Sequence, residues 1–474
     1  MNAKYDVIIV GAGPAGAMCA YELHEKMPQG SVLLLDKGND IEHRHCPILE
    51  KKLVRCPERP DGHAECFPAC SITSGFGGAG AYSDGKFNIT AEYGGWLTEY
   101  LDPADVEELI EYVDAVNLKF GAPTETTDPT TEKVKEIERR GLAVGLKLLR
   151  GKVRHLGTDV NLRILKNLYR DLAQKITMRH QTEVVDVLVE NGRVAGVVLK
   201  DGATIAAKQV VICPGREGSQ WLSDICAKQG IKMHANHVDI GVRVETNNEI
   251  MQEINENLYE GKFIFRTTLG TQVRTFCSNP SGHVVIENFS GTILANGHAY
   301  SDSDLGSKNT NFAILVSHEF TEPFHQPNEF AHGVANLANM LANGSIILQR
   351  YGDLKMGRRS TDKRIREGFV VPTLKEAVPG DLGLVLPYKT LRSIIEMIEA
   401  LDHVTPGIAS EHTLFYGVEA KFYSARPEID DRFETPVRGL YVGGDGAGIT
   451  RGLAQAGANG IRIARAIAGT FEMK

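Results

Sequence analysis

A glycine-rich motif near the start of the chain has the residue types and the spacing that bind a dinucleotide. Residues 11–16 read GAGPAG and follow the apolar run Tyr5–Val10. In this context the first glycine permits a tight turn, the second leaves room for a pyrophosphate, and the third lets a helix pack on the strand. Asp36 follows Gly16 by 20 residues, the spacing at which a carboxylate bonds a ribose hydroxyl. The predicted contacts of this segment are Gly11, Ala12, Gly13, Ala15, Gly16, Asp36 and Lys37.

A second glycine turn, GGDGAG at 443–448, indicates which dinucleotide to expect. A nicotinamide dinucleotide needs no such turn, whereas the ribityl chain and ring of a flavin extend beyond the pyrophosphate and need contacts of their own. The strand, turn and helix here resemble the second flavin-contacting motif of FAD proteins with the glutathione-reductase-type fold. The resemblance implies that Asp445 bonds the ribityl or pyrophosphate region and that the following helix N-terminus faces the flavin ring. The contacts implied here are Gly444, Asp445, Gly446 and Gly452.

Two more segments resemble flavin-binding parts of the same superfamily. Residues 182–216 combine a hairpin, a turn and an apolar strand that ends in Pro214-Gly215, like the small β-meander of these proteins. The segment SGFGGAGAYSDGK at 74–86 resembles the flavin-side loop of fumarate-reductase-like flavoproteins, in which glycines let the backbone lie against the ring. The contacts that these resemblances imply are Gly77, Gly78, Ala79, Ser83, Lys86, Val184 and Gly215.

Nearly the whole chain resembles a bacterial family of FAD-dependent dehydrogenases, also called NAD(P)/FAD-dependent oxidoreductases. The matching segments include VDIGVRVE at 238–245, NTNFAILVS at 309–317, TLFYGVEAKFYSARPE at 413–428 and GDGAGITRGLAQAGANG at 444–460. The resemblance implies an FAD-dependent oxidoreductase that exchanges hydride between the flavin and a small organic molecule. It does not define the substrate.

Four polar residues are candidates for the chemistry beside the flavin. Arg451 begins the helix after the second glycine turn, where a cation opposes the helix dipole and therefore suggests an anionic partner; a surface salt bridge is the alternative. Lys421 and Tyr423 alternate along GVEAKFYS and share one strand face, which either meets the substrate or is solvated. His298 titrates near neutral pH and is either a proton donor or a structural histidine. The catalytic candidates are Arg451, Lys421, Tyr423 and His298.

The cysteines leave several interpretations open. Eight cysteines are too few for a disulfide scaffold of this length. Four of them fall in the irregular segment 40–100: Cys46, Cys56, Cys66 and Cys70. Only Cys66 and Cys70 have a zinc-like spacing, and no second cysteine lies close to Cys46 in sequence, where a disulfide reductase of this fold would need one. A metal or cluster, a redox-active pair and ordinary thiols stay as alternatives, and we predict that there is no metal site.

The elements that must position these residues indicate an α/β fold. Residues 5–37 predict a strand–helix–strand unit with a right-handed crossover. Helices are expected over 105–120, 131–149 and from Asp159, and strands return at 182–213 and 438–442. No low-complexity linker separates the parts. We therefore expect a Rossmann-like FAD-binding domain, made of a parallel sheet plus a β-meander, with an inserted α+β substrate domain. The expected boundaries are 1–220 and 431–474 for the FAD domain and 221–430 for the insertion.

Composition narrows the class of protein. The 474 residues are 42% apolar and 24% charged, which excludes wholesale disorder. The net charge of −8 argues against coating of nucleic acid or anionic membrane. No apolar run approaches the roughly 18 residues of a membrane span, and the short N-terminal run reads as a buried strand rather than a signal peptide. We expect a cytoplasmic protein with a small-molecule substrate and without nucleic-acid or membrane partners.

Two competing functions belong to other classes. One is a tRNA-modifying flavoprotein of related fold, which the negative charge disfavours. The other is a non-enzymatic electron carrier. No second GxGxxG motif follows a strand elsewhere in the chain, so a dedicated NAD(P)H domain is not visible. Reduction by transiently bound NAD(P)H or by an external electron carrier stays open, and the sequence does not indicate an oligomeric state.

Overall fold

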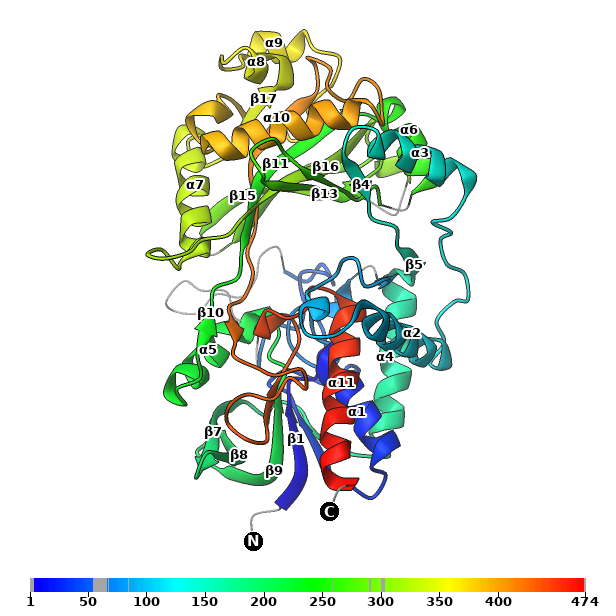
Figure 1. Cartoon of the computed structure of the whole chain (residues 1–474), viewed down its shortest axis with the longest axis vertical. Coiled ribbons are helices and arrows are strands. Elements are labelled where there is room, and N and C mark those ends of the chain that lie inside the picture. The colour runs from blue at the N-terminus through cyan, green and yellow to red at the C-terminus, as the bar shows by residue number, and fades with distance from the viewer. Residues whose placement is uncertain are drawn as a thin grey trace. The chain divides into compact units, whose positions relative to one another are not determined.

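A computed structural model describes residues 4–53, 66, 68–83, 85–258, 260–289, 291–299 and 303–472. The chain forms two compact units (Figure 1). Unit 1 comprises Met1–Thr127, Gly151–His234 and Ser424–Lys474, and unit 2 comprises Asp128–Arg150 and Ala235–Tyr423. Each unit is described separately. Among the described residues, no helix is long and apolar enough to cross a membrane.

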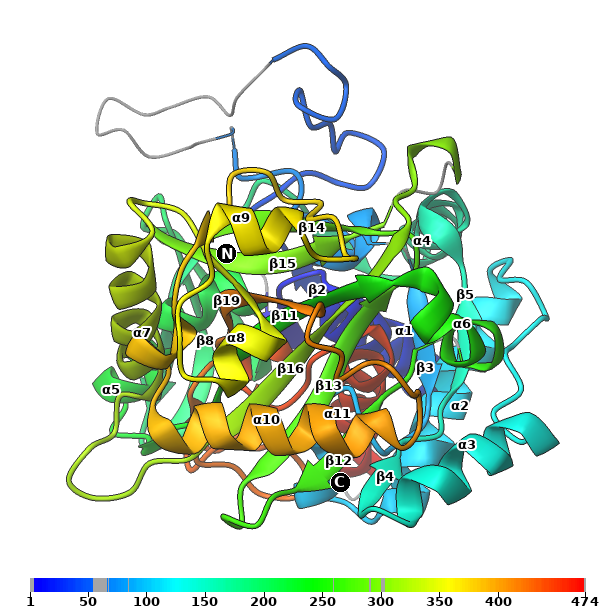
Figure 2. The ribbon, with the colours of Figure 1, turned by 90° about the horizontal axis from the view of Figure 1, so that it is seen from above.

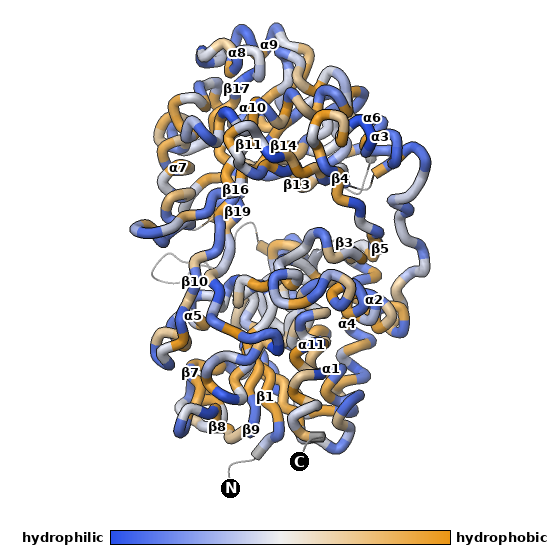
Figure 3. Tube along the Cα trace, in the orientation of Figure 1, coloured by the Kyte–Doolittle hydropathy of each residue, from blue (hydrophilic) through white to orange (hydrophobic). Residues whose placement is uncertain are grey.

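Unit 1 contains the expected parallel sheet and β-meander in one seven-stranded sheet. Its strands run in the order β6 (Thr177–Arg179), β2 (Val32–Leu35), β1 (Lys4–Val10), β9 (Thr204–Ile212), β8 (Arg193–Leu199) and β7 (Val184–Glu190), and β21 (Leu440–Val442) also pairs with β9. Strands β6, β2, β1, β9 and β21 are parallel, and β7–β8–β9 are antiparallel. Val7, Ile8 and Ile9 are fully buried, as in a sheet covered on both faces. The strands of this sheet are largely hydrophobic in Figure 3.

Strand β9 belongs to both parts of this sheet. Its first residues pair with β8 in the meander, and its last residues, from Val210, pair with β21. Its other edge pairs with β1 along most of its length. The sequence predicted only the end of this strand, from Gln209, because charged Lys208 interrupts the apolar pattern before it.

In the described part of unit 1, five α-helices accompany the sheet: α1 (Pro14–Lys26), α2 (Pro103–Lys119), α4 (Gly157–Leu172), α5 (Ser219–Lys228) and α11 (Leu453–Glu472). The first and last of these cross closely, because a Cβ atom at Gly460 would lie closer than 3.0 Å to the carbonyl of Ala15. Buried Glu22 of α1 accepts hydrogen bonds from Arg465 (2.8 Å) and Tyr112 (2.7 Å). Two short strand pairs complete the unit: β3 (Lys86–Ile89) with β5 (Lys152–His155), and β10 (Met233–His234) with β20 (Arg426–Pro427).

Unit 2 is a second, mainly antiparallel sheet with helices. The strand order is β18 (Val378–Pro379), β17 (Ile347–Arg350), β19 (Leu414–Lys421), β11 (Val238–Asn247), β16 (Asn309–His318), β13 (Gln272–Asn279), β12 (Phe263–Arg266) and β4 (Leu146–Leu148). A hairpin, β14 (His283–Phe289) and β15 (Thr292–His298), is separate from this sheet. The helices are α3 (Glu132–Leu142), α6 (Asn248–Asn257), α7 (Pro327–Leu341), α8 (Tyr351–Lys355), α9 (Asp362–Arg366) and α10 (Tyr388–Asp402).

The two faces of the unit 2 sheet differ in character. On β11, apolar Val238, Ile240, Val242 and Val244 alternate with polar or small residues, so that one face is apolar and the other polar. Figure 2 shows α10 lying along the sheet. This helix packs with the apolar face. The opposite face holds Asp239, Arg243 and Glu245, all fully buried.

The helix predicted over 131–149 is wrong in its second half. Helix α3 ends at Leu142, and residues 146–148 form β4, which pairs with β12. Gly145 adopts a φ of 80°, which ends the helical path. Val144 and Leu148 fit a helical period, but Val144 lies in the turn after α3 and Leu148 lies in the edge strand β4. The predicted domain boundaries stay a prediction; by contacts, residues 128–150 lie in unit 2.

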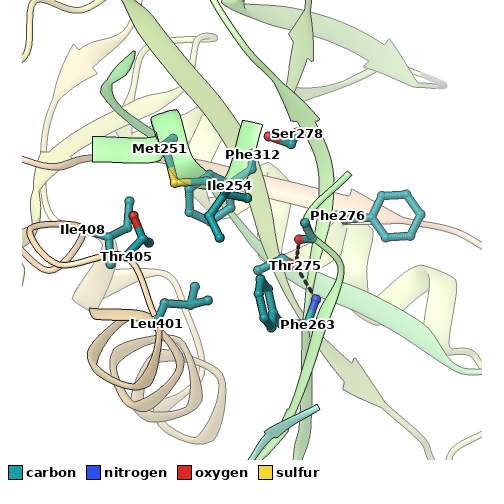
Figure 4. Close-up of a pocket in the computed structure, with 11 residues that line it drawn as sticks. Met251, Ile254, Phe263, Thr275, Phe276, Ser278, Phe312, Leu401, Thr405 and Ile408 are labelled. Carbon is teal, nitrogen blue, oxygen red and sulfur yellow. Dashed lines mark hydrogen bonds between the residues drawn. The ribbon is translucent and has the colours of Figure 1, made fainter. Parts of the chain in front are cut away.

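A small void lies in the core of unit 2 (Figure 4). Its volume of about 20 Å³ accommodates roughly one water molecule. The lining is mostly apolar, from α6, α10 and strands of the sheet, and includes Met251, Ile254, Phe263, Phe312, Leu401 and Ile408. This void is a packing feature of the core and is too small for an organic ligand.

Candidate functional site

The GAGPAG turn has the geometry that its position between β1 and α1 requires. Gly11 has a φ of 99° and donates its amide to Leu35 O at 2.8 Å. A Cβ atom at Gly11 would lie closer than 3.0 Å to Cys213 O, and one at Gly16 would come equally close to Gly11 O. The fold itself therefore requires glycine at positions 11 and 16, since any side chain there would displace backbone.

Gly13 differs from its two neighbours, because nothing in the folded chain requires it. Its φ is −69° and its ψ is −175°, which any residue adopts. A Cβ atom there would meet only Gly78 Cα, at 3.9 Å. Hydrogen bonding within α1 begins with the amide of Ala17, which donates to Gly13 O, so the amide of Ala15 precedes the first intrahelical bond. The missing side chain leaves space at a helix N-terminus, where a phosphate binds favourably.

The Asp36 carboxylate joins three segments. Its Oδ2 accepts from the amide of Ala12 at 2.8 Å, and its Oδ1 accepts from the amides of Gly38 (2.8 Å) and Gly75 (2.9 Å). The side chain is 9% exposed. Asp36 thus fixes the glycine turn and the 74–83 loop, a role that the sequence did not indicate. Oδ2 accepts one of these hydrogen bonds and can accept a second one. The predicted hydrogen bond from a ribose hydroxyl to Asp36 stays a prediction.

Two more residues were predicted at this end of the site. Lys37 Nζ pairs with Glu217 at 2.7 Å, and both side chains are partly exposed. Val184 is buried at the start of β7. The adjoining amide of Thr182 donates to Asp36 O at 2.9 Å, which brings the start of the meander to the end of β2. The roles of Lys37 and Val184 toward a cofactor stay predictions.

The 74–83 loop lies directly on the glycine turn. The amide of Gly77, whose φ is 86°, donates to Ala12 O at 2.8 Å. A Cβ atom at Gly80 would lie closer than 3.0 Å to Leu453 Cδ2 and 3.4 Å from Pro14 Cγ. The loop thus contacts the first residues of both α1 and α11. Beneath it lies an apolar cavity of about 40 Å³, which Phe87, Leu165 and Leu168 help to line.

The other predicted loop residues have different surroundings. Ala79 is exposed, and Ser83 Oγ donates to Gly80 O at 2.8 Å. Lys86 begins β3, which pairs with β5. Ser83 therefore closes a turn within the loop, while Ala79 is accessible to a ligand.

The second glycine turn meets the first one. Gly444 comes within reach of Ala15, since a Cβ atom at Gly444 would lie 3.3 Å from Ala15 Cβ. The amide of Gly444 donates to Asn459 Oδ1 at 2.8 Å. A Cβ atom at Gly446 would lie closer than 3.0 Å to Gly215 O. Segments from the start, middle and end of the chain therefore come together at one place in unit 1, as the proposed single ligand requires.

Asp445 lies in this turn next to the start of α11. Its Oδ1 accepts from Thr450 Oγ1 at 2.6 Å. Burial raises the pKa of Asp445, while Arg216, Arg451 and the amide of Gly452 act in the opposite direction. Sequence analysis missed Arg216, which lies close enough to influence Asp445 although it is far away in sequence.

Residues 93–99 form another part of the site that the sequence did not reveal. Arg451 donates its amide to Gly94 O at 2.9 Å, and Trp96 donates its amide to Ile449 O at 2.9 Å. The guanidinium of Arg426 lies 4.8 Å from the centre of the Trp96 ring and pairs with Glu99. The sequence Gly94-Gly95-Trp96 could have indicated this contact, because paired glycines before an aromatic residue indicate that another backbone segment approaches closely.

Lys421 belongs to a buried ionic cluster on the polar face of the unit 2 sheet. Its Nζ lies 3.0 Å from Glu419 Oε1, and Arg243 Nε lies 3.3 Å from Glu419 Oε2. Neither carboxylate oxygen of Glu419 accepts a hydrogen bond from the described residues, so both contacts are ion pairs without hydrogen bonds. Arg243 and Glu419 are fully buried. Lys421 therefore lies on a buried strand face and not on the solvated face that the sequence left as an alternative.

The Tyr423 hydroxyl lies between the Asp239 carboxylate and the Arg274 guanidinium on the same face of the sheet. Its hydroxyl donates to Asp239 Oδ2 at 2.6 Å and accepts from Arg274 Nη2 at 2.7 Å. Ser317 also donates to Asp239, at 2.7 Å. Burial of Asp239 opposes ionisation, but Arg274, His237 and these hydroxyls outweigh it and lower the pKa of Asp239 to about 2. The Asp239 carboxylate is therefore charged at neutral pH.

The histidine candidate lies elsewhere in unit 2. His298 is exposed at the last residue of β15, opposite His283. The first residue of β15, Thr292, bonds His332 at 2.9 Å, and the His332 ring lies 4.5 Å from Phe422. Near the His298 end of β15, Asn296 Oδ1 accepts a hydrogen bond from Arg243 Nη2 at 3.2 Å, so this strand borders the ionic cluster, and a catalytic role of His298 stays a prediction.

The cysteines give no metal centre among the described residues. Cys46 and Cys70 are free thiols there, Cys66 is partly buried, and Cys56 lies outside the described residues. In the part of the chain that the structure describes, no group of three or more His, Cys, Asp or Glu side chains is arranged to hold a metal ion.

Comparison with known family models shows which family the chain belongs to. Residues 6–271 match the family model described as FAD dependent oxidoreductase, which spans more than half of the chain, and residues 237–422 match FAD-dependent protein, C-terminal domain-like. The chain belongs to the FAD dependent oxidoreductase family. The expected cofactor, FAD, and the expected class of activity are thereby confirmed.

This FAD-dependent oxidoreductase has distant relatives. It is 26% identical to an uncharacterized protein of Clostridium beijerinckii, over 98% of this chain and 81% of that protein. Similar solved structures include Aspergillus oryzae formate oxidase (TM-score 0.45, 12% identity, 100% and 99% of the two chains covered) and L-proline dehydrogenase from P. horikoshii (TM-score 0.36, 13% identity, 99% and 95% covered).

Proposed function

We propose that the FAD-dependent oxidoreductase binds its cofactor at the glycine turns of unit 1. The observation that carries this proposal is Gly13, whose missing side chain serves neither the backbone nor the packing and leaves space at a helix N-terminus. The proposed contacts are Gly11, Ala12, Gly13, Ala15, Gly16, Asp36, Lys37, Gly77, Gly78, Ala79, Ser83, Lys86, Val184, Gly215, Gly444, Asp445, Gly446 and Gly452.

The chain's own groups match the parts of an FAD molecule in charge and polarity. The N-terminus of α1 presents amides to phosphates, and Asp36 has an acceptor for a ribose hydroxyl. Asp445 and the N-terminus of α11 present an acid and amides farther along. FAD, when bound, supplies hydride transfer at the N5 atom of its ring.

We propose that unit 2 is the substrate domain and that its polar sheet face binds the small organic substrate. The unit then comprises 128–150 and 235–423, rather than the sequence-based 221–430. A buried ionic face is costly unless it serves a purpose, and six ionisable side chains of the described residues lie on this one: Asp239, Arg243, Glu245, Arg274, Glu419 and Lys421. This density of charge supports a binding role better than a packing role.

Tyr423 is the proposed proton-transfer group on this face. Its hydroxyl oxygen accepts from Arg274 and its proton lies toward Asp239 Oδ2. A proton taken from a substrate hydroxyl or amine by the phenolic oxygen is balanced by movement of the Tyr423 proton through Asp239 to solvent, because Asp239, with a pKa of about 2, does not hold a proton at neutral pH. Arg274 keeps the phenolic oxygen oriented during that exchange. Lys421 is proposed to bind an anionic or carbonyl group of the substrate on this face, and Arg451 stays a proposed catalytic residue beside the flavin in unit 1.

Anaerobic reduction of the purified flavoprotein tests this function. The FAD-loaded protein is mixed in a stopped-flow instrument with panels of small organic donors, with NADH and NADPH, and with a reduced ferredoxin, and bleaching of the flavin absorbance is followed. Two-electron bleaching by an organic donor, slowed in Tyr423→Phe, is the expected result. If the flavin exchanges electrons with the ferredoxin and with no organic donor, the proposal is wrong and the protein is an electron carrier.

A further inference from the structure

Arg44 is a buried cation at the centre of the flavin-side loop. Its side chain is 5% exposed. The guanidinium donates to Ser71 O (2.6 and 3.0 Å), Ile72 O (3.1 Å), Phe76 O (2.7 Å) and Gly78 O (2.9 Å). One side chain therefore gathers four carbonyls of the segment 71–78 and sets its path.

Among the described residues, no carboxylate forms an ion pair with Arg44, and Asp36 favours the charged form only at longer range. The other partner of Arg44 is Tyr82, whose ring centre lies 5.1 Å from the guanidinium carbon and whose hydroxyl donates to Arg44 O. Buried Arg154 differs, because Asp114 binds it with both carboxylate oxygens. Burial lowers the pKa of Arg44, which shows the cost of keeping it charged. A buried charge of this kind calls for an anion nearby.

The phosphate cradle is the place where such an anion is expected. Gly78, whose carbonyl accepts from Arg44, also packs on the first glycine turn: a Cβ atom at Gly78 would lie 3.0 Å from Gly13 Cα. A single residue thus separates the guanidinium from the turn. The turn itself, GAGPAG, contains no cation, and nearby Lys37 is already paired with Glu217.

We propose that Arg44 is a positioning residue that acts as the buried counter-charge for the FAD pyrophosphate. It acts through the 71–78 loop without touching the phosphates. The inference rests on the proposed location of FAD in unit 1. A charge behind the loop attracts the pyrophosphate with little screening by salt, and the four carbonyl bonds keep the loop against the turn. Arg44 therefore favours ligands with phosphates over ligands without them.

Ligand pairs that differ only in phosphate separate this role from a structural one. Apoprotein is titrated with FAD, and ADP and adenosine are measured in competition against FAD. The variants are Arg44→Met, which removes the charge, and Arg44→Lys, which keeps the charge but cannot bond four carbonyls. Arg154→Met is the matched control, because it removes a buried arginine from the same unit away from the turn.

The expected result is a change in the ratio of ADP affinity to adenosine affinity. In Arg44→Met this ratio falls about tenfold or more, and it stays lowered at high salt. In Arg44→Lys most of the ratio is retained, and in Arg154→Met both affinities change together. Equal losses for ADP and adenosine in both Arg44 variants would overturn the counter-charge role. Failure of the unmodified protein to bind ADP or FAD would instead overturn the proposed site, and this inference with it.

Discussion

Replacement of Gly13 by valine separates a glycine kept for the ligand from glycines kept for the fold. Valine fits the extended backbone at Gly13, and its Cβ has no neighbour closer than 3.9 Å, so we expect the unfolding free energy of the apoprotein to change by less than about 1 kcal/mol. The added methyl groups occupy the space in front of the helix amides. Loss of two charge-assisted hydrogen bonds to phosphate, at about 1.5–3 kcal/mol each, weakens FAD binding about 100-fold or more.

Two glycine variants serve as controls for this prediction. Gly16→Val places Cβ against Gly11 O, closer than 3.0 Å, and should prevent folding. Gly333→Val, on α7 with nothing within 4 Å, should leave FAD binding unchanged. FAD affinity is measured by quenching of flavin fluorescence, and apoprotein stability by thermal unfolding. A Gly13→Val protein that purifies with a full complement of FAD would refute the argument, as would one that unfolds like Gly16→Val.

Three further predictions address the remaining sites. Tyr423→Phe should lower kcat about 100-fold with FAD affinity unchanged, and a full rate in this variant would remove Tyr423 from the chemistry. His318 has its pKa lowered by burial to about 4 from an ordinary 6.5, so the unfolded chain takes up its proton first. The contribution of His318 to the free energy of unfolding should therefore be complete above pH 6.5 and fall by up to about 3 kcal/mol as the pH drops toward 4. His318→Gln should reduce the slope of the free energy of unfolding against pH between pH 6.5 and 5. An unchanged slope would show that His318 does not cause this pH dependence. Trp221→Phe leaves Trp96 as the single tryptophan, and binding of FAD should quench its emission; undiminished emission would place FAD away from Trp96.

The regular parts of the cofactor domain could be predicted because local signals there agree with the fold. The apolar strand before GAGPAG is buried on both faces, and the second glycine turn joins β21 to α11, as the patterns indicated. Rossmann-type turns depend on residues adjacent in sequence, so that one chain segment shows the whole motif. The α3–β4 boundary was missed because an amphipathic period does not distinguish a helix turn from a following edge strand.

The parts of the site that depend on strand register or on distant segments could not be predicted. Lys421 and Tyr423 share a face as the alternation indicated. Lys421 pairs with Glu419 of its own strand, but the partners of Tyr423 come from β11 and β13, which only the sheet register brings close. Arg44 bonds carbonyls more than 25 residues away, and carbonyl acceptors leave no mark in the sequence. His298 was a candidate by residue type alone, and residue type does not fix location.

Hydrogen–deuterium exchange of the apoprotein, with and without FAD, tests the central claim most directly. If one FAD lies across segments from three parts of the chain, its addition should slow amide exchange together in residues 12–17, 77–80 and 444–453, while the buried strands of unit 2 exchange as before. Slowing that is confined to a single one of these segments, or no change at saturating FAD, would contradict the account.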